Sequence, residues 1–176
     1  MAFKVGQKVV YPNHGVSLIE KIDGAPFGDA EQTFYHLRLF SNESKVMVPK
    51  ENLELVGLRP LNAQTEIKAL FKALRNDTFE TYKDWKGRYK QNLDKMKTGE
   101  LAEVAKVLKN LELVSSKKSL SFREKKMYER AKYFIVSEVA HVKSIDEADA
   151  EKQVDKALAL GMGKLMAGMD IELTAK

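Results

Sequence analysis

The chain has 176 residues, 44% of them hydrophobic, which is enough for one packed domain or two small ones. Its 30 Lys and Arg exceed its 25 Asp and Glu and give a net charge of +5, which is compatible with a polyanionic partner but does not require one. The absence of cysteine excludes disulfides and thiolate metal sites, and because no apolar run is long enough for a membrane span or a signal peptide, we expect a cytoplasmic protein.

Residues 1–60 predict a small β domain. Leu37 and Leu39, and again Val46 and Val48, recur at the period of two that is typical of strands with one buried face. Runs of β-branched and aromatic residues occupy 8–11, 16–19, 34–40 and 45–48, and turn-forming segments separate them at 12–15, 23–29 and 41–44. So many short strands in so few residues suit a small, strongly bent barrel or rolled sheet, which we expect to end at Pro60.

From residue 61 the hydrophobic spacing becomes helical. Ile67, Leu70, Phe71 and Leu74, for example, stand at positions i, i+3, i+4 and i+7. Helices are predicted over residues 63–74, through Trp85 to about residue 97, and over 100–114, 121–141 and 147–160. The sequence therefore predicts an α+β fold, with a β domain in residues 1–60 followed by an all-helical domain of about five helices in residues 61–160.

Local signals mark the helix ends. Gly99 suits a left-handed C-cap, Ser121 and Glu124 have the letters of a capping box, and Gly161 is expected to stop the last helix. A similar N-terminal capping pattern stands at residues 77–80. The segment 161–176, which includes Met162, Met166 and Met169, is expected to be a flexible or loosely packed tail.

Catalysis has little support in the sequence. His14, His36 and His141 fall in a turn, a strand and a helix end, and none has a second ligand or a nucleophile at a productive local spacing. The carboxylates stand on solvated helix faces beside lysines. We therefore expect a protein that is not an enzyme and that needs neither a cofactor nor a metal.

The candidate functional stretch is residues 84–93, which contains the only tryptophan in the chain. Trp85 stands among Lys86, Arg88 and Lys90, next to Tyr89. Cations of this kind neutralise nucleic-acid phosphates, and a large flat ring stacks on bases or wedges between them. The same letters also suit an amphipathic helix with an ordinary core tryptophan.

Helical periodicity favours the second interpretation. One continuous helix places apolar residues in a single sector and lysines on its flank, so that the ring is buried and the lysines form a solvated edge. The sector contains Tyr82, Trp85, Tyr89, Leu93 and Met96, and the flank contains Lys83, Lys86, Lys90 and Lys97.

Two residues favour the first interpretation. Asp84 is a good N-cap, and Gly87 weakens a helix interior by about 1 kcal/mol relative to alanine. If the helix begins at Asp84, Trp85 can project from its first turn. Arg88 and Lys90 would then flank a helix N-terminus that itself suits a phosphate.

Two blocks of sequence resemble the CarD/CdnL family of bacterial transcription regulators. The resemblance covers nearly the whole chain, from residue 3 to about residue 160. The N-terminal block comprises residues 3–16, 46–49 and 56–59, and the C-terminal block comprises residues 85–93, Gly99 and residues 120–125. The resemblance implies a Tudor-like N-terminal domain that docks on the RNA polymerase β subunit. It also implies a helical C-terminal domain that contacts promoter DNA, without sequence specificity, at the upstream edge of the transcription bubble.

The resemblance also implies site residues. The family tryptophan, which matches Trp85, is expected to wedge into the minor groove at the fork, while neighbouring cations hold phosphates. Arg88 and Lys90 match those cations, and the segment from Val46 to Pro49 matches the docking segment of the family. Together with the lysine flank of the helix, the predicted DNA-binding set is Trp85, Arg88, Lys90, Lys86, Lys83 and Lys97, and the polymerase-binding set is Val46, Met47, Val48 and Pro49.

This chain departs from the family pattern at three positions. Some family members have an arginine in place of Met47 and a basic residue in place of Ala25. A basic residue is also frequent in the family at the position of Gly87. Ionic docking contacts at the first two positions are therefore not expected, and Trp85 has one cation fewer beside it. We expect a monomer that associates with the nucleoid through the polymerase. The alternative is a protein–protein adaptor that makes no direct DNA contact and buries Trp85.

Overall fold

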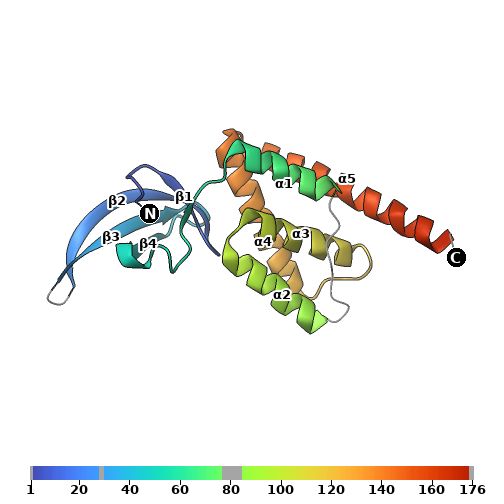
Figure 1. Ribbon diagram of the computed structural model, residues 1–176, viewed down its shortest axis with the longest axis horizontal. Coiled ribbons are helices and arrows are strands. Elements are labelled where there is room, and N and C mark those ends of the chain that lie inside the picture. Colours follow the sequence, from blue (N-terminus) through green and yellow to red (C-terminus); the bar gives the residue numbers. More distant parts are fainter. Residues whose placement is uncertain (1, 28–29, 77–84, 175–176) are drawn as a thin grey trace. The chain divides into compact units, whose positions relative to one another are not determined.

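The computed structural model describes residues 2–27, 30–76 and 85–174 of the chain (Figure 1). The chain forms two compact units. The sheet unit comprises Met1–Leu61 together with Lys97–Gly99, and the helical unit comprises Asn62–Met96 and Glu100–Lys176. An antiparallel sheet followed by helices confirms the predicted α+β class.

The sheet unit has an antiparallel five-stranded sheet of order β4-β3-β2-β1-β5 in the described residues. Because β4 ends this order, it pairs with β3 alone and forms an edge of the sheet. A single turn of 3-10 helix follows it. The strands are β1 (Lys8–Tyr11), β2 (Gly15–Phe27), β3 (Ala30–Leu39), β4 (Lys45–Pro49) and β5 (Arg59–Pro60), and the 3-10 turn is η1 (Lys50–Asn52).

The β2–β3 hairpin is longer than predicted. The expected turn at residues 23–29 is wrong for residues 23–27, which continue β2 as far as the pair Phe27↔Ala30. Gly24 and Pro26 resemble turn residues, but β1 pairs with β2 only as far as Leu18. Beyond that point β2 has one strand neighbour, and an edge of this kind accepts a proline.

The predicted alternation of buried and exposed residues is confirmed. Ile19 lies opposite Leu37, and Tyr35 lies opposite Val48, all on the buried face of the sheet. On the other face Met47 is 54% exposed. The buried cluster of the sheet unit consists of Phe3, Val9, Ile19, Tyr35, Leu37, Val48, Leu53 and Leu58.

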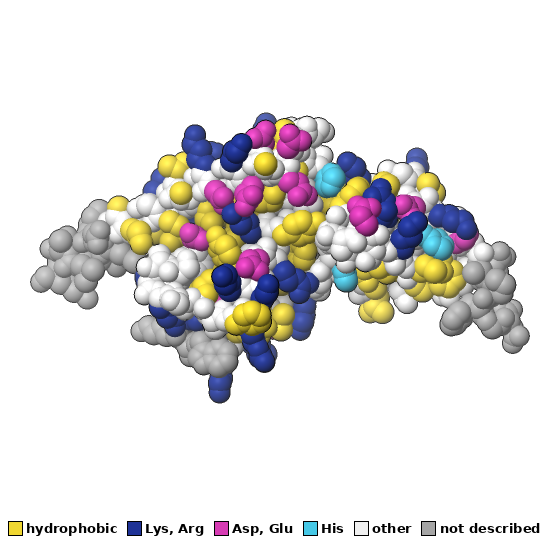
Figure 2. All heavy atoms as spheres, turned by 180° about the vertical axis from the view of Figure 1, so that it is seen from behind, with side chains coloured by type: hydrophobic (Ala, Val, Ile, Leu, Met, Phe, Trp, Pro, Cys, Tyr) yellow, Lys and Arg dark blue, Asp and Glu magenta, His cyan; other side chains and the backbone are white. Residues whose placement is uncertain are grey.

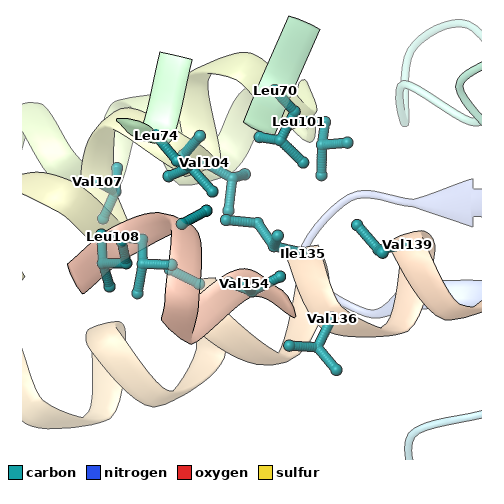
Figure 3. Packing of buried hydrophobic residues seen from close by; sticks show 14 of the residues in the cluster. Leu70, Leu74, Leu101, Val104, Val107, Leu108, Ile135, Val136, Val139 and Val154 are labelled. Carbon is teal, nitrogen blue, oxygen red and sulfur yellow. The ribbon is translucent and has the colours of Figure 1, made fainter. Parts of the chain in front are cut away.

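The helical unit is held together by a second apolar cluster (Figure 3). α1 packs along α5, α3 packs against α4, and α4 packs against α5. Leu74, Leu108, Ile135 and Val154 are among its buried side chains. No helix in the described part of the chain is long and apolar enough to cross a membrane. The helices are α1 (Gln64–Asn76), α2 (Trp85–Thr98), α3 (Leu101–Ser115), α4 (Phe122–Lys143) and α5 (Glu147–Thr174).

Two of the predicted caps are confirmed. Gly99 has a φ of +67°, and a Cβ at this position would come within 2.7 Å of Pro12. Ser121 Oγ accepts a hydrogen bond from the Glu124 N–H, and the Glu124 side chain accepts one from the Ser121 N–H, as in a capping box. The pattern at residues 77–80 lies outside the described residues.

The predicted end of the last helix is wrong, because α5 continues through Gly161 to Thr174. A Cβ on Gly161 would lie 2.0 Å from the carbonyl oxygen of Leu74 in α1. The glycine therefore lets the two helices approach closely, and this packing outweighs its helix-weakening cost of about 1 kcal/mol. The expectation of a loose tail is also wrong for its first residues, because Gly161 and Met162 are buried.

Candidate nucleic-acid interface

α2 carries the candidate stretch, and its described part begins at Trp85. The proposed cap Asp84 and the flanking Lys83 lie outside the described residues, as does the side chain of Trp85. The first turn of this helix includes Lys86 and Arg88. These two residues, separated by Gly87, have very different surroundings.

The exposed side of α2 carries the predicted lysines. Lys86 and Lys90 are exposed, whereas Tyr89 and Leu93 are partly buried against the core of the helical unit and Met96 is fully buried. The division of this helix into an apolar sector and a lysine flank is therefore confirmed for the described residues. Lys97 is also exposed, but it groups with the sheet unit and stands about three turns beyond Lys86 along α2.

Arg88 is not placed as the sequence predicts. It is 2% exposed, and its Nε and Nη2 donate to Glu124 Oε1 over 3.0 and 2.6 Å. Leaving one charge of such a buried pair without its partner costs about 3–5 kcal/mol, so a contact between Arg88 and a phosphate would be expensive. We therefore correct the assignment of Arg88 to the phosphate-binding surface: in this structure the guanidinium belongs to the interior of the helical unit.

Glu124 connects two elements through one carboxylate. Its Oε1 accepts from Arg88 in α2, and its Oε2 accepts from the N–H and the Oγ of Ser121 over 3.1 and 2.9 Å. Burial by itself raises the pKa of Glu124, but the hydrogen bonds from Arg88 and Ser121 outweigh burial, so the pKa is lowered below its ordinary value. The carboxylate is therefore charged at neutral pH.

The start of α4 adds an aromatic and basic surface that sequence reasoning missed. Phe122, the first residue of α4, is 76% exposed, and Lys126 Nζ lies 5.9 Å from the centre of its ring. Arg123 and Lys125 are exposed beside it. The available signal was a large aromatic residue directly after the N-cap Ser121, before the apolar stripe that begins at Met127.

The starts of α2 and α4 are neighbours, because the Arg88–Glu124 pair joins them (Figure 1). Both lie in the lower part of the helical unit in that view. Figure 2 shows the helical unit from behind, with Lys and Arg predominating over its lower part and yellow apolar side chains among them, while most Asp and Glu lie higher. We call the surface formed by Lys86, Lys90, Phe122, Arg123, Lys125 and Lys126 the basic-aromatic surface.

In the sheet unit, the predicted polymerase-binding residues fall on the edge strand β4. Val48 points into the core, whereas Met47 is exposed on the opposite face and Val46 and Pro49 are half-buried. An edge strand presents main-chain N–H and C=O groups on the side away from its neighbour. A strand from another protein can extend such a sheet.

Two of the histidines have printed side-chain neighbours, and one of them, His36, stands on β3 directly opposite Met47 of β4. His14 stacks on Tyr11 with ring centres 4.6 Å apart, and His36 Nε2 lies 2.6 Å from Asp23 Oδ1. In the described part of the chain, no group of three or more His, Asp or Glu side chains is arranged to hold a metal ion.

A small sheet with an open edge, followed by helices that present a basic-aromatic surface, defines a two-part binding protein. Comparison with known families agrees with this description. Residues 3–62 match the CarD-like/TRCF RID domain, and residues 69–155 match the CarD C-terminal domain. A Bacillus subtilis (strain 168) protein named "Putative transcription factor YdeB" is 34% identical over 145 residues, which are 82% of this chain and 95% of that relative.

The chain therefore belongs to the CarD family, which confirms the resemblance identified from its sequence. This is a family of transcription regulators that interact with RNA polymerase, and it is not a family of enzymes.

Proposed function

We propose that the protein docks on the RNA polymerase β subunit through its sheet unit and stabilises the promoter open complex through its helical unit. The helical unit contacts the upstream fork of the transcription bubble, on the minor-groove side and without reading base sequence. The observation that carries the proposal is the basic-aromatic surface, which gathers around the start of α2 where Trp85 stands. The protein acts as a cytoplasmic monomer, associates with the nucleoid through the polymerase, and needs no cofactor.

Docking uses β4 as an edge to which a polymerase strand is added. Main-chain hydrogen bonds supply the affinity in this mode, and alternate side chains supply the specificity. Met47 and Pro49 are the side chains placed to contact the partner, since Val48 is buried in the sheet unit. Because Met47 and Ala25 stand where some family members have basic residues, this contact is apolar and main-chain in character rather than ionic.

DNA binding uses cations for the phosphates and an aromatic ring for the distorted step. Lys86 and Lys90 neutralise phosphates, with Lys83 and Lys97 on either side of the stretch as further candidates, and Trp85 wedges at the fork. A wedge fits opened DNA better than closed duplex, and this difference in affinity is sufficient to shift the equilibrium towards the open complex. Docking on the polymerase raises the effective concentration of this weak contact.

Substitution of Trp85 by alanine tests the proposal. We expect Trp85→Ala to leave the fold and polymerase binding intact and to shorten the lifetime of open complexes on a promoter fragment. Leu160→Ala is the matched control, because Leu160 is an exposed apolar residue on α5 of the same helical unit. An unchanged lifetime with folded Trp85→Ala protein would contradict the proposal.

One observation favours a second candidate function. Tyr89, Leu93 and Met96 continue the apolar sector that contains Trp85, and all three pack against the helical core. If Trp85 packs there as well, the protein is an adaptor that binds other proteins without contacting DNA. Trp85→Ala would then lower the free energy of unfolding by about 3–5 kcal/mol, as expected for a core aromatic residue.

A further inference from the structure

The basic-aromatic surface is divided between two helices, so its geometry depends on what holds their starts together. Arg88 stands one turn after Trp85 in α2, and Glu124 stands two residues after Phe122 in α4. Their side chains are 3% and 5% exposed and form an ion pair with a 2.6 Å contact. The interaction therefore lies within a few residues, along α2 and α4, of Lys86, Lys90 and Phe122.

The carboxylate of Glu124 is also held from within its own helix start. Ser121 donates its N–H and its hydroxyl to Oε2, and these bonds belong to the capping box that starts α4. The other oxygen accepts two donors from Arg88, Nε and Nη2. Because two nitrogen atoms of one planar guanidinium meet one fixed oxygen, the contact restricts the rotation of α2 about its axis as well as its distance from α4.

The remaining polar residue of this buried side does not provide such an anchor. Asn92 is one turn further along α2 and is 1% exposed, yet no described residue hydrogen-bonds its side-chain amide. The apolar contacts of Tyr89 and Leu93 hold α2 against the core but have no comparable directionality. The Arg88–Glu124 pair thus gives the first turn of α2 a directional contact with α4.

Stability alone does not account for a pair of this kind. A buried ion pair contributes little net stability compared with apolar residues of similar volume, and its best-documented role is to specify one arrangement over others. We infer that the Arg88–Glu124 pair is a positioning element, which sets the rotation of α2 about its axis and thereby the presentation of Lys86 and Lys90 to the same DNA as Phe122 of α4. This inference rests on the proposed DNA contact of the helical unit.

The test compares three full-length variants for binding to a forked DNA, a duplex that ends in two unpaired strands, measured by fluorescence anisotropy at several salt concentrations. Arg88→Met/Glu124→Gln removes both charges, so that neither is left buried alone. We expect this variant to fold with a Tm near that of the wild type but to bind forked DNA about tenfold more weakly. The salt dependence should not change, because Arg88 makes no phosphate contact in this account.

Arg88→Lys is the second variant, because it keeps a cation for Glu124 but loses the planar guanidinium that donates two hydrogen bonds to it. It should bind forked DNA about threefold more weakly, again with unchanged salt dependence. It also provides the test if the double variant does not fold. Wild-type affinity in the folded variants would show that the pair only supports the fold, and a salt slope reduced by about one in Arg88→Met/Glu124→Gln would show that Arg88 itself contacts phosphate. Either result overturns the inference.

Trp85→Ala separates this inference from the proposed function. If Trp85→Ala weakens binding to forked DNA while the Arg88 variants bind as the wild type does, only the positioning role fails. If Trp85→Ala also binds as the wild type does, the proposed DNA contact fails, and the positioning role fails with it.

Discussion

The two units place their candidate binding surfaces in different ways. In the sheet unit the surface is a strand edge, and its main-chain groups are fixed by the pairing of β4 with β3. In the helical unit the surface consists of side chains from α2 and α4, and a buried ion pair connects the two helix starts. An edge strand is thus a property of the sheet itself, whereas the basic-aromatic surface depends on one polar contact between residues far apart in sequence.

The largest expected effect follows from removing only one partner of the Arg88–Glu124 ion pair. Arg88→Met leaves the carboxylate of Glu124 buried without a cation, so the helical unit should lose about 3–5 kcal/mol of unfolding free energy. Urea unfolding followed by helical circular dichroism measures this loss. Polymerase binding through the sheet unit should persist under native conditions. A loss below about 1 kcal/mol would contradict the account, because an ion pair worth so little behaves like a solvent-exposed salt bridge.

Acid offers an independent check on the same pair. The folded-state pKa of Glu124 is lowered, so the carboxylate binds protons more readily in the unfolded chain. Its contribution to stability is therefore complete above the ordinary glutamate pKa of about 4.3 and is lost as pH falls through the lower folded value. Glu124→Gln should remove this part of the acid sensitivity.

A smaller effect is expected where α5 crosses α1. Gly161→Ala should destabilise the helical unit by about 1–3 kcal/mol, because its Cβ would meet the backbone oxygen of Leu74 and the helices would have to separate. Gly163→Ala is the matched control, since a Cβ there meets no atom within 4 Å. The control should gain up to about 1 kcal/mol of helix stability. Thermal unfolding of both variants measures the two changes in stability. Equal changes would contradict the close approach of α5 to α1 at Gly161.

A substitution in the docking strand β4 should change the affinity for RNA polymerase rather than the stability of the fold. Met47→Ala is expected to weaken binding to purified RNA polymerase about tenfold, the loss expected when an apolar side chain no longer fills its contact. The melting temperature should be nearly unchanged, because Met47 is 54% exposed. Leu55→Ala is the control, an 84% exposed apolar residue of the same unit outside β4. Equal binding by the two variants would argue against β4 as the docking strand.

The smallest expected effect concerns single phosphate contacts. Lys90→Gln should reduce the slope of log affinity against log salt for duplex DNA by about 0.9, the value for one released counterion. Lys156→Gln, which removes an exposed lysine from α5 of the same unit, should leave the slope unchanged. Identical slopes for Lys90→Gln and the wild type would remove Lys90 from the contact surface.

Features with local causes were predictable from the sequence. The strand alternation at Leu37 and Leu39, the glycine cap at Gly99 and the box formed by Ser121 and Glu124 each depend on residues a few positions apart. The confirmed division of α2 into lysines and apolar residues has the same origin. Helix and strand periods therefore predicted the order of the elements and most of their bounds.

Features that depend on distant partners were not predictable in this way. Gly161 is a residue type that often ends a helix, but here it allows the close approach of α5 to the backbone of Leu74. Arg88 was expected on the surface because it is a cation, but it is buried because it pairs with Glu124, 36 positions later. In each case the deciding neighbour lies beyond the reach of local sequence patterns.

The most direct measurement uses the emission of Trp85, which reports on one position because the chain has a single tryptophan. The account predicts solvent-exposed emission in the free protein and strong quenching or a spectral shift on adding forked promoter DNA, with a much smaller change for closed duplex. Blue-shifted emission that forked DNA does not alter would contradict the account, because it would place the ring in the core of the helical unit.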